Sequence, residues 1–378
     1  MAHANVNPSQ LLWSRLRAGL TLDEIAAKLP ARTDKVLAWE SGESRPTFIQ
    51  AQKWAKVAHI PFGFLFLARP PQERLPIPDL RTVGCETPST PSLDLLETVK
   101  DVLRKQAWYI DYLREHEADA LPFVGRFSAK SKIADVVADI RRVLGADVGD
   151  RPRSADEYLR TLISAADQAG VLVMRSGIVG SNTHRPLDVG EFRGFAISDP
   201  LAPTVFINSA DAPKARIFTL VHELAHIWIG SSGISTATVR EARDEEVFCN
   251  AVAGEFLAPG KEFSQRWDEG TAWIENVGRL ADTFRVSTLT AARRAADLGF
   301  ITRAMYREFY TAELEAFRNR NKGGGGDFYT NLRVRNSTSF SRAVAAEAMS
   351  GRVLLRDAGA LLSIHPAKIR TFAGDLLQ

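Results

Sequence analysis

The sequence predicts a mostly helical α+β protein with more than one domain. Its 378 residues correspond to two or three domains of roughly 150 residues each. Apolar residues make up 45% and charged residues 25% of the chain, a composition typical of globular proteins. Short strand-like segments occur only in the middle of the chain, between two series of helical segments. This order favours a small sheet within a helical α+β fold.

The first 68 residues predict a bundle of short helices, which we take as the first domain. Apolar residues recur at helical spacing, and Thr21 precedes two acidic residues as a typical N-cap. The expected helices cover residues 10–18, 22–28, 34–39 and 48–57. Six prolines then lie between residues 70 and 91, which predicts an extended linker over residues 69–92.

Residues 93–322 predict the second domain, and a run of four glycines at 323–326 predicts a flexible joint before a small helical tail, 323–378. Before the sheet, helices are expected at 93–117, 133–144 and 155–168. Strands are expected at 171–174, 192–197 and 204–207, where short β-branched or aromatic runs end at Gly, Asp or Pro. Further helices are expected at 215–229, 240–256 and 273–284, and in the tail at 339–348, 355–362 and 366–376.

Charge and cysteine content exclude several classes of protein. The formal charge of +3 is too balanced for a chain that coats nucleic acid, so any such contact must be local. Two cysteines, Cys85 and Cys249, are too few for a disulfide framework. The start of the chain does not resemble a signal peptide, and the apolar run at 62–68 is far shorter than the roughly 20 residues of a membrane span. We therefore expect a cytoplasmic protein that does not contact the membrane.

The strongest functional signal is a His-Glu-x-x-His motif formed by His222, Glu223 and His226. Two histidines four residues apart lie on one face of a helix, where both can bind one ion. Neutral imidazoles suit Zn²⁺, and the apolar residues around them keep the site dry. Glu223, beside the first histidine, is the candidate general base that takes a proton from the attacking water.

A catalytic zinc needs a third protein ligand, and the next helical segment offers several carboxylates. Glu246 is the preferred candidate, because Asn250 follows one helical turn later and could orient a ligand. Spacing alone does not separate Glu246 from Glu245. The sequence also does not identify the group that stabilises the reaction's oxyanion, for which His184, Arg193 and Tyr310 are candidates.

The motif and the segment Glu246-x-x-Cys-Asn250-x-Val-Ala-x-x-Phe-Leu-Ala-Pro259 resemble the ImmA/IrrE family of zinc metallopeptidases. The resemblance covers about residues 170–300. It implies a zincin-like domain in which a small sheet leads into the zinc helix, and it places Glu246 at the third-ligand position. Cys249 and Val252 replace the family's usual Ala and Phe, and both changes are apolar.

Residues 11–68 resemble the XRE-type helix-turn-helix of phage repressors. The residues that carry this resemblance run from Arg17 to Leu29 and from Val36 to Thr47. In that fold the third helix enters the major groove, which makes Arg32, Thr33 and Lys35, with Asp34, candidates for contacts to an operator. We expect a homodimer on a two-fold site. Eight basic residues against five acidic ones in residues 1–68 are a modest excess for a DNA-binding domain.

Together these features predict a DNA-binding regulator with zinc-dependent endopeptidase activity. The ImmA/IrrE resemblance implies a specific protein substrate, such as a repressor or antitoxin, in phage, mobile-element, toxin–antitoxin or stress regulation. The alternative is a repressor or antitoxin that acts only by binding DNA and a protein partner such as a co-encoded toxin. An intact Glu223 favours the enzyme, because a purely structural fold has no use for that carboxylate.

Overall fold

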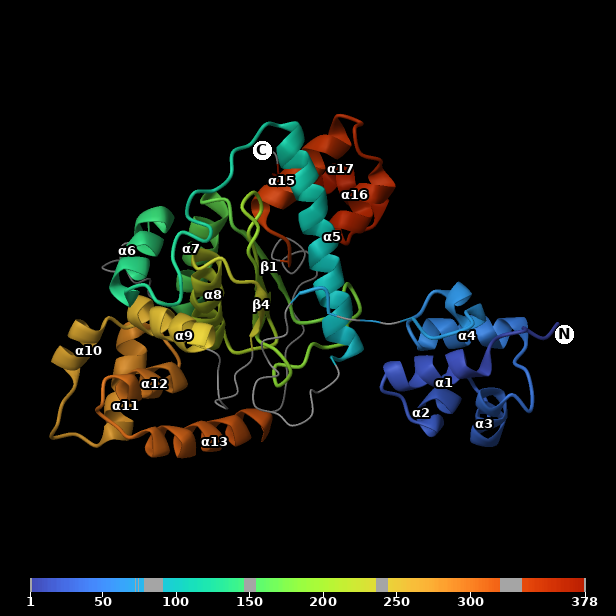
Figure 1. Cartoon of the computed structure of the whole chain (residues 1–378), viewed down its shortest axis with the longest axis horizontal. Coiled ribbons are helices and arrows are strands. Elements are labelled where there is room, and N and C mark those ends of the chain that lie inside the picture. Colours follow the sequence, from blue (N-terminus) through green and yellow to red (C-terminus); the bar gives the residue numbers. More distant parts are fainter. Residues whose placement is uncertain are drawn as a thin grey trace. The chain divides into compact units, whose positions relative to one another are not determined.

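The computed structural model describes residues 2–71, 73, 75–77, 91–145, 154–235, 244–319 and 335–376. Two compact units make up the chain: residues 1–76 with 89–97, and residues 77–88 with 98–378. Helices predominate, and one small mixed sheet lies in the larger unit (Figure 1), so the predicted α+β class is confirmed. Cys85, most of the expected linker and the glycine joint lie outside the described residues.

The smaller unit is a bundle of short helices, as the apolar spacing predicted. Its core is formed by apolar side chains from every helix, with Trp39 and Trp54 packed edge to face. Thr21 caps the second helix in a capping box with Glu24, the predicted N-cap. The helices are α1 (Pro8–Arg17), α2 (Leu22–Lys28), α3 (Thr33–Ser41) and α4 (Phe48–Val57), followed by the 3₁₀ turn η1 (Phe62–Phe66).

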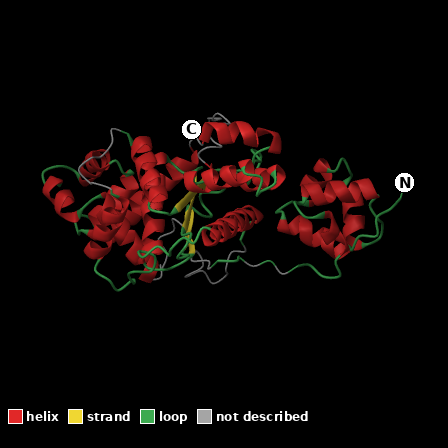
Figure 2. Cartoon of the chain, turned by 90° about the horizontal axis from the view of Figure 1, so that it is seen from above, coloured by secondary structure: helices red, strands yellow, loops and turns green. Residues whose placement is uncertain are grey.

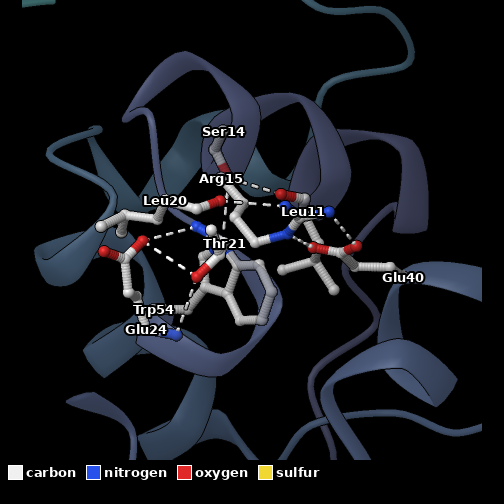
Figure 3. Close-up of polar contacts among 8 residues, drawn as sticks. All are labelled: Leu11, Ser14, Arg15, Leu20, Thr21, Glu24, Glu40 and Trp54. Carbon is white, nitrogen blue, oxygen red and sulfur yellow. Dashed lines mark hydrogen bonds and ion pairs between the residues drawn. The ribbon is translucent and has the colours of Figure 1, made fainter. Parts of the chain in front are cut away.

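A buried ion pair joins α1 to α3 in this unit (Figure 3). Arg15 Nε and Nη2 donate to the two carboxylate oxygens of Glu40 at 2.7 and 2.9 Å, and Arg15 Nη1 donates to the Leu20 carbonyl at 2.9 Å. The side chains of Arg15 and Glu40 are only 9% and 5% exposed. Because both charges are satisfied by hydrogen bonds, the pair fixes the geometry of α1 and α3 without leaving a buried charge unpaired.

The larger unit contains a four-stranded sheet in the order β1-β3-β2-β4. β1 (Leu172–Ser176) runs parallel to β3 (Thr204–Asn208), whereas β2 (Gly194–Ile197) pairs antiparallel with β3 and β4. The edge strand β4 (Gly233–Ser235) was not predicted, because three residues that begin with glycine give no alternating pattern. The strand expected over 192–197 begins only at Gly194.

Helices pack around this small sheet and make up most of the larger unit (Figure 2). Before the sheet come α5 (Leu93–Glu115), α6 (Ile133–Leu144) and α7 (Ala155–Gln168), and after it α8 (Pro213–Trp228), α9 (Asp244–Leu257), α10 (Gly260–Arg266), α11 (Trp273–Phe284), α12 (Thr288–Asp297) and α13 (Arg303–Asn319). The expected start of α9 at residue 240 lies outside the described residues. The core between sheet and helices includes the apolar face of α8. None of the described helices combines the length and the apolar composition of a membrane span.

The tail contains α15 (Thr338–Met349), α16 (Leu355–Leu362), the 3₁₀ turn η3 (Pro366–Lys368) and α17 (Ile369–Leu376), close to the predicted bounds. It is joined to the rest of the larger unit by buried and half-buried polar contacts. Ser339 donates from its backbone N and its hydroxyl to Asp167 of α7 at 3.1 and 2.8 Å. Lys105 of α5 donates to Asn336 at 3.0 Å and pairs with Asp101 at 2.7 Å.

The Arg15–Glu40 pair should be essential to the smaller unit. Arg15→Met leaves the Glu40 carboxylate buried without its cation, so the free energy of opening of α1 and α3 should fall by about 3–5 kcal/mol. Hydrogen exchange of the backbone amides of these helices in the whole chain measures this loss. Arg32→Met is the matched control, because the side chains of the Arg32–Asp34 pair are 85% and 64% exposed. This substitution should change the opening free energy of the same amides by less than about 1 kcal/mol. Equal effects of the two variants would contradict a structural role for the buried pair.

Candidate metal centre

Helix α8 brings two histidines together in the core of the larger unit. Pro213 occupies the first turn, and the residues from Thr219 to Trp228 are all buried. Within this buried half, His222 and His226 lie four residues apart on the same face, and their Nε2 atoms are 3.1 Å apart. The predicted motif therefore presents both imidazoles to one point, as binding of a single ion requires.

Glu246 of α9 completes the cluster. Its Oε2 lies 3.3 Å from His222 Nε2, and its Oε1 lies 3.0 Å from His226 Nε2. One potential ligand atom from each of the three residues lies within 4.8 Å of the others. The neighbouring Glu245 instead accepts a hydrogen bond of 2.8 Å from the Ser231 hydroxyl. Of these two glutamates, Glu246 is the one that faces the histidines, and its role as the third ligand stays a prediction.

The charges of the cluster suit a cation. Burial lowers the pKa of His222 below its ordinary value, although Glu246 opposes this shift. Burial also opposes ionisation of Glu246, but the neighbouring imidazoles outweigh it, and the pKa of the carboxyl lies well below its usual range. The two lowered pKa values favour a neutral His222 imidazole and an ionised Glu246 carboxylate, the forms in which these groups bind metal. Two nitrogens and a carboxylate are a donor set that suits zinc and leaves a position for a substrate.

Glu223, the predicted general base, is fully buried on α8 beside the strand β2. A Cβ atom on Gly194 of β2 would lie 3.0 Å from Glu223 Oε1, 2.8 Å from the Phe206 carbonyl oxygen and 2.7 Å from Thr219 Cγ2. Only glycine permits this approach of strand and helix. The contact places the Glu223 carboxylate against the sheet, one residue from the first histidine.

The other predicted site residues lie outside the cluster of His222, His226 and Glu246. Asn250 is half-buried one turn beyond Glu246, and among the described residues no hydrogen bond joins it to the cluster, so its orienting role stays a prediction. His184 is exposed in the segment between β1 and β2. Arg193 precedes β2, with its Nε 3.5 Å from Asp211 Oδ2, and Tyr310 of α13 lies with its ring centroid 6.2 Å from that of Tyr306.

Sequence reasoning did not identify two groups near the cluster, Arg293 of α12 and Tyr306 of α13. The positive charge of Arg293 contributes to lowering the pKa of His222, after the larger effects of burial. Arg293 also tends to lower the pKa of Tyr306, but burial of Tyr306 raises it overall. Arg293 follows the segment Phe284-Arg-Val-Ser287, which resembles the ImmA/IrrE family together with Arg293-Arg294, but that resemblance assigned it no place at the cluster. Only the tertiary fold identifies them.

The predicted DNA-contacting residues lie at the start of α3 and make contacts within the unit. Arg32 donates to Asp34 at 3.1 and 2.6 Å, and the Thr33 hydroxyl donates to Asp23 at 2.8 Å. The Lys35 ammonium lies 5.8 Å from the centre of the Trp39 ring. All three residues are at the surface or close to it. Their contacts to DNA stay predictions.

Comparison with known families supports the peptidase interpretation for the middle of the chain. Residues 166–296 match the model of the IrrE N-terminal-like domain, a peptidase family. The match spans β1 to α12 and includes the whole cluster, and it supports the resemblance to the ImmA/IrrE family in this part of the chain. Residues 336–375, which contain α15 to α17, match a domain of unknown function. No curated protein matches the chain.

Replacing Glu246 and Glu245 one at a time by glutamine should show which of the two glutamates binds zinc. We expect Glu246→Gln to weaken zinc binding by more than the about 10- to 100-fold typical of an outer-shell change, because it removes the anionic donor. Glu245→Gln should leave zinc affinity unchanged, since Glu245 faces Ser231. Competition against a chelator, with the bound zinc counted by elemental analysis, measures both. The reverse order of effects would show that the neighbouring glutamate is the ligand.

Proposed function

We propose that this chain is a zinc-dependent endopeptidase that cuts a specific regulatory protein. The observation that carries the proposal is the buried convergence of His222, His226 and Glu246 with Glu223 beside them. Zinc held by the three ligands supplies Lewis-acid chemistry for the attack of water on a peptide carbonyl. The family match over residues 166–296 supports a metallopeptidase independently of this geometry.

The protein's own groups carry the proton transfers in this proposal. Glu223 has no place among the three ligands, so its carboxylate can take the proton from the attacking water and pass it to the leaving amine. The close packing of Gly194 against Glu223 limits the positions that this carboxylate can adopt. Apolar neighbours such as Phe218, whose ring stacks on His222 with centroids 6.2 Å apart, limit the access of bulk water.

The substrate we propose is a repressor or an antitoxin, cut to release phage, mobile-element or stress genes. The support is the resemblance to the ImmA/IrrE family together with the helical bundle in the same chain. That bundle resembles an XRE-type helix-turn-helix. Its α2 has the predicted bounds, and α3 includes the predicted residues 34–39 but extends to Thr33 and Ser41. A DNA-binding unit would bring the peptidase to a substrate bound at the operator, or would repress the chain's own operon.

Substitution of the base should separate catalysis from metal binding. Glu223→Gln keeps the shape of the side chain but removes the base, so zinc content and thermal stability should stay near wild type. Cleavage of a co-encoded repressor, antitoxin or toxin, assayed with and without operator DNA, should fall by about 10²–10⁴-fold. If the variant cleaves at the wild-type rate, the hydrolytic mechanism is wrong. If neither protein cleaves the partner but both neutralise it, the binding-only alternative is correct.

DNA binding by the chain should depend on the start of α3. We expect the whole protein to protect an operator near its own promoter, with affinity that falls steeply as salt rises. Lys35→Ala should cost about 1–3 kcal/mol of binding free energy if the ammonium contacts a base. Lys53→Ala, on α4, is the matched control and should have the smaller effect. No footprint at low salt would show that the bundle is a docking module.

A further inference from the structure

An exposed apolar surface lies on the smaller unit, at the start of α4 and along the turn η1. The Phe62 ring contacts Phe48 on one side and Phe66 on the other, edge to face, with centroid distances of 5.1 and 5.2 Å. Ile49 follows Phe48 in the chain, and Leu67 follows Phe66. These five residues form the apolar patch, and all of them except the half-buried Phe62 are between 40% and 59% exposed. Contiguous apolar groups at a protein surface mark interaction sites.

Hydrogen bonds hold both segments of the apolar patch in place. Thr47 and Gln50 form a capping box at the start of α4. The Leu65 carbonyl of η1 accepts from the Asn7 backbone N at 2.8 Å, and the Leu67 carbonyl accepts from Asn7 Nδ2 at 2.9 Å. Because the backbone is fixed on both sides, a partner that docks on the patch has little ordering of the protein to offset.

The segments that carry the apolar patch are basic. Residues 44–72 contain four Lys or Arg and no Asp or Glu. Lys53 and Lys56 lie four and seven residues after Ile49, on the same face of α4, and all three side chains are exposed. The exposed face of α4 therefore continues from the apolar patch into a short row of ammonium groups.

This combination favours an acidic apolar partner over a second copy of the chain. In a two-fold interface the same surface meets itself, so Lys53 and Lys56 would lie near their own counterparts. Residues 44–72 bring no carboxylate to offset that repulsion. Duplex DNA would match the lysines but would leave the apolar patch without a partner. An amphipathic helix with acidic residues beside its apolar stripe matches both features.

We propose that the apolar patch, with Lys53 and Lys56 beside it, docks an acidic amphipathic helix of another protein. The apolar stripe of that helix covers the phenylalanine rings and Ile49, and its carboxylates lie against the two lysines. The inference goes beyond the proposed peptidase function and does not depend on it, because no predicted metal ligand belongs to this surface. It also uses none of the residues of α3 that are predicted to contact DNA.

Three labelled peptides, held helical by the same covalent staple, test the surface. The first carries leucines on one face with glutamates beside them, the second has lysine in place of each glutamate, and the third has the composition of the first but no apolar face. Fluorescence anisotropy measures their binding to the whole protein. The first peptide should bind at least about tenfold more tightly than either of the others, because only it matches both the rings and the charges. Equal binding of the third peptide, or tighter binding of the second, would overturn the proposal.

Matched substitutions locate the binding. Ile49→Ser should weaken binding of the acidic amphipathic peptide severalfold, whereas Leu16→Ser changes a side chain of α1 that is similarly exposed, 61% against 59%, and should leave it unchanged. Combined Lys53→Glu and Lys56→Glu should reverse the preference in favour of the basic peptide. Lys28→Glu, at an exposed position of α2, should not. Equal effects of Ile49→Ser and Leu16→Ser would show that the peptide binds elsewhere and would overturn the proposal.

Sedimentation distinguishes the other possible occupants of the apolar patch. We expect Ile49→Ser to leave the mass of the whole protein in solution unchanged, and wild type not to sediment with phosphatidylglycerol vesicles. A wild-type dimer that Ile49→Ser converts to a monomer would assign the patch to a second copy. Vesicle binding that Ile49→Ser abolishes would assign it to an anionic lipid surface. Either of these two results would overturn the proposal.

Discussion

The larger unit is organised around one buried carboxylate, Glu246, held between two buried imidazoles. A carboxylate removed from water costs several kcal/mol unless cations or hydrogen-bond donors surround it. Here the imidazoles come from α8 and the carboxylate from α9, so the contacts between them require these two helices to pack closely. This demand links the stability of the unit to the geometry of its candidate site.

Apolar burial provides the driving force for this packing. Leu220, Val221, Leu224 and Ile227 of α8 are all fully buried, and each contributes about 1.5–3 kcal/mol by leaving water. The end of the helix is anchored by a polar contact, since Trp228 Nε1 donates to Asp139 of α6 at 2.9 Å and Arg126 donates to the same carboxyl group at 2.9 Å. The sheet approaches the other face at Gly194. The histidine face of α8 therefore has little freedom to rotate about the helix axis.

Part of this arrangement could be predicted from the sequence. The bounds of α6, α11 and α16 follow the apolar spacing to the residue, and the His-Glu-x-x-His motif lies on α8 as expected. Adjacent glutamates on a helix could not be separated by spacing, because the choice depends on where α9 meets α8 and on the Ser231 hydroxyl that binds Glu245. Sequence reasoning gave neither Arg293 nor Tyr306 a role at the cluster. Their place near the cluster follows from the way α12 and α13 return after α9.

The smaller unit contains an exposed ion pair, Arg32–Asp34, and a buried one, Arg15–Glu40. The exposed pair is easier to break, which matters for the proposed DNA binding. An exposed pair such as Arg32–Asp34 contributes at most about 1 kcal/mol, so a phosphate oxygen can replace Asp34 at little cost. Arg15 cannot be released in this way, since its loss would leave Glu40 buried and unpaired. In the proposed DNA complex, the basic residues free to contact DNA would therefore be those exposed on α3 and its neighbours. Asp34, at the same helix start, would repel phosphate unless it accepts from a base amino group. If the bundle binds DNA as proposed, its affinity would therefore depend on how Arg32 and Asp34 are arranged at the operator.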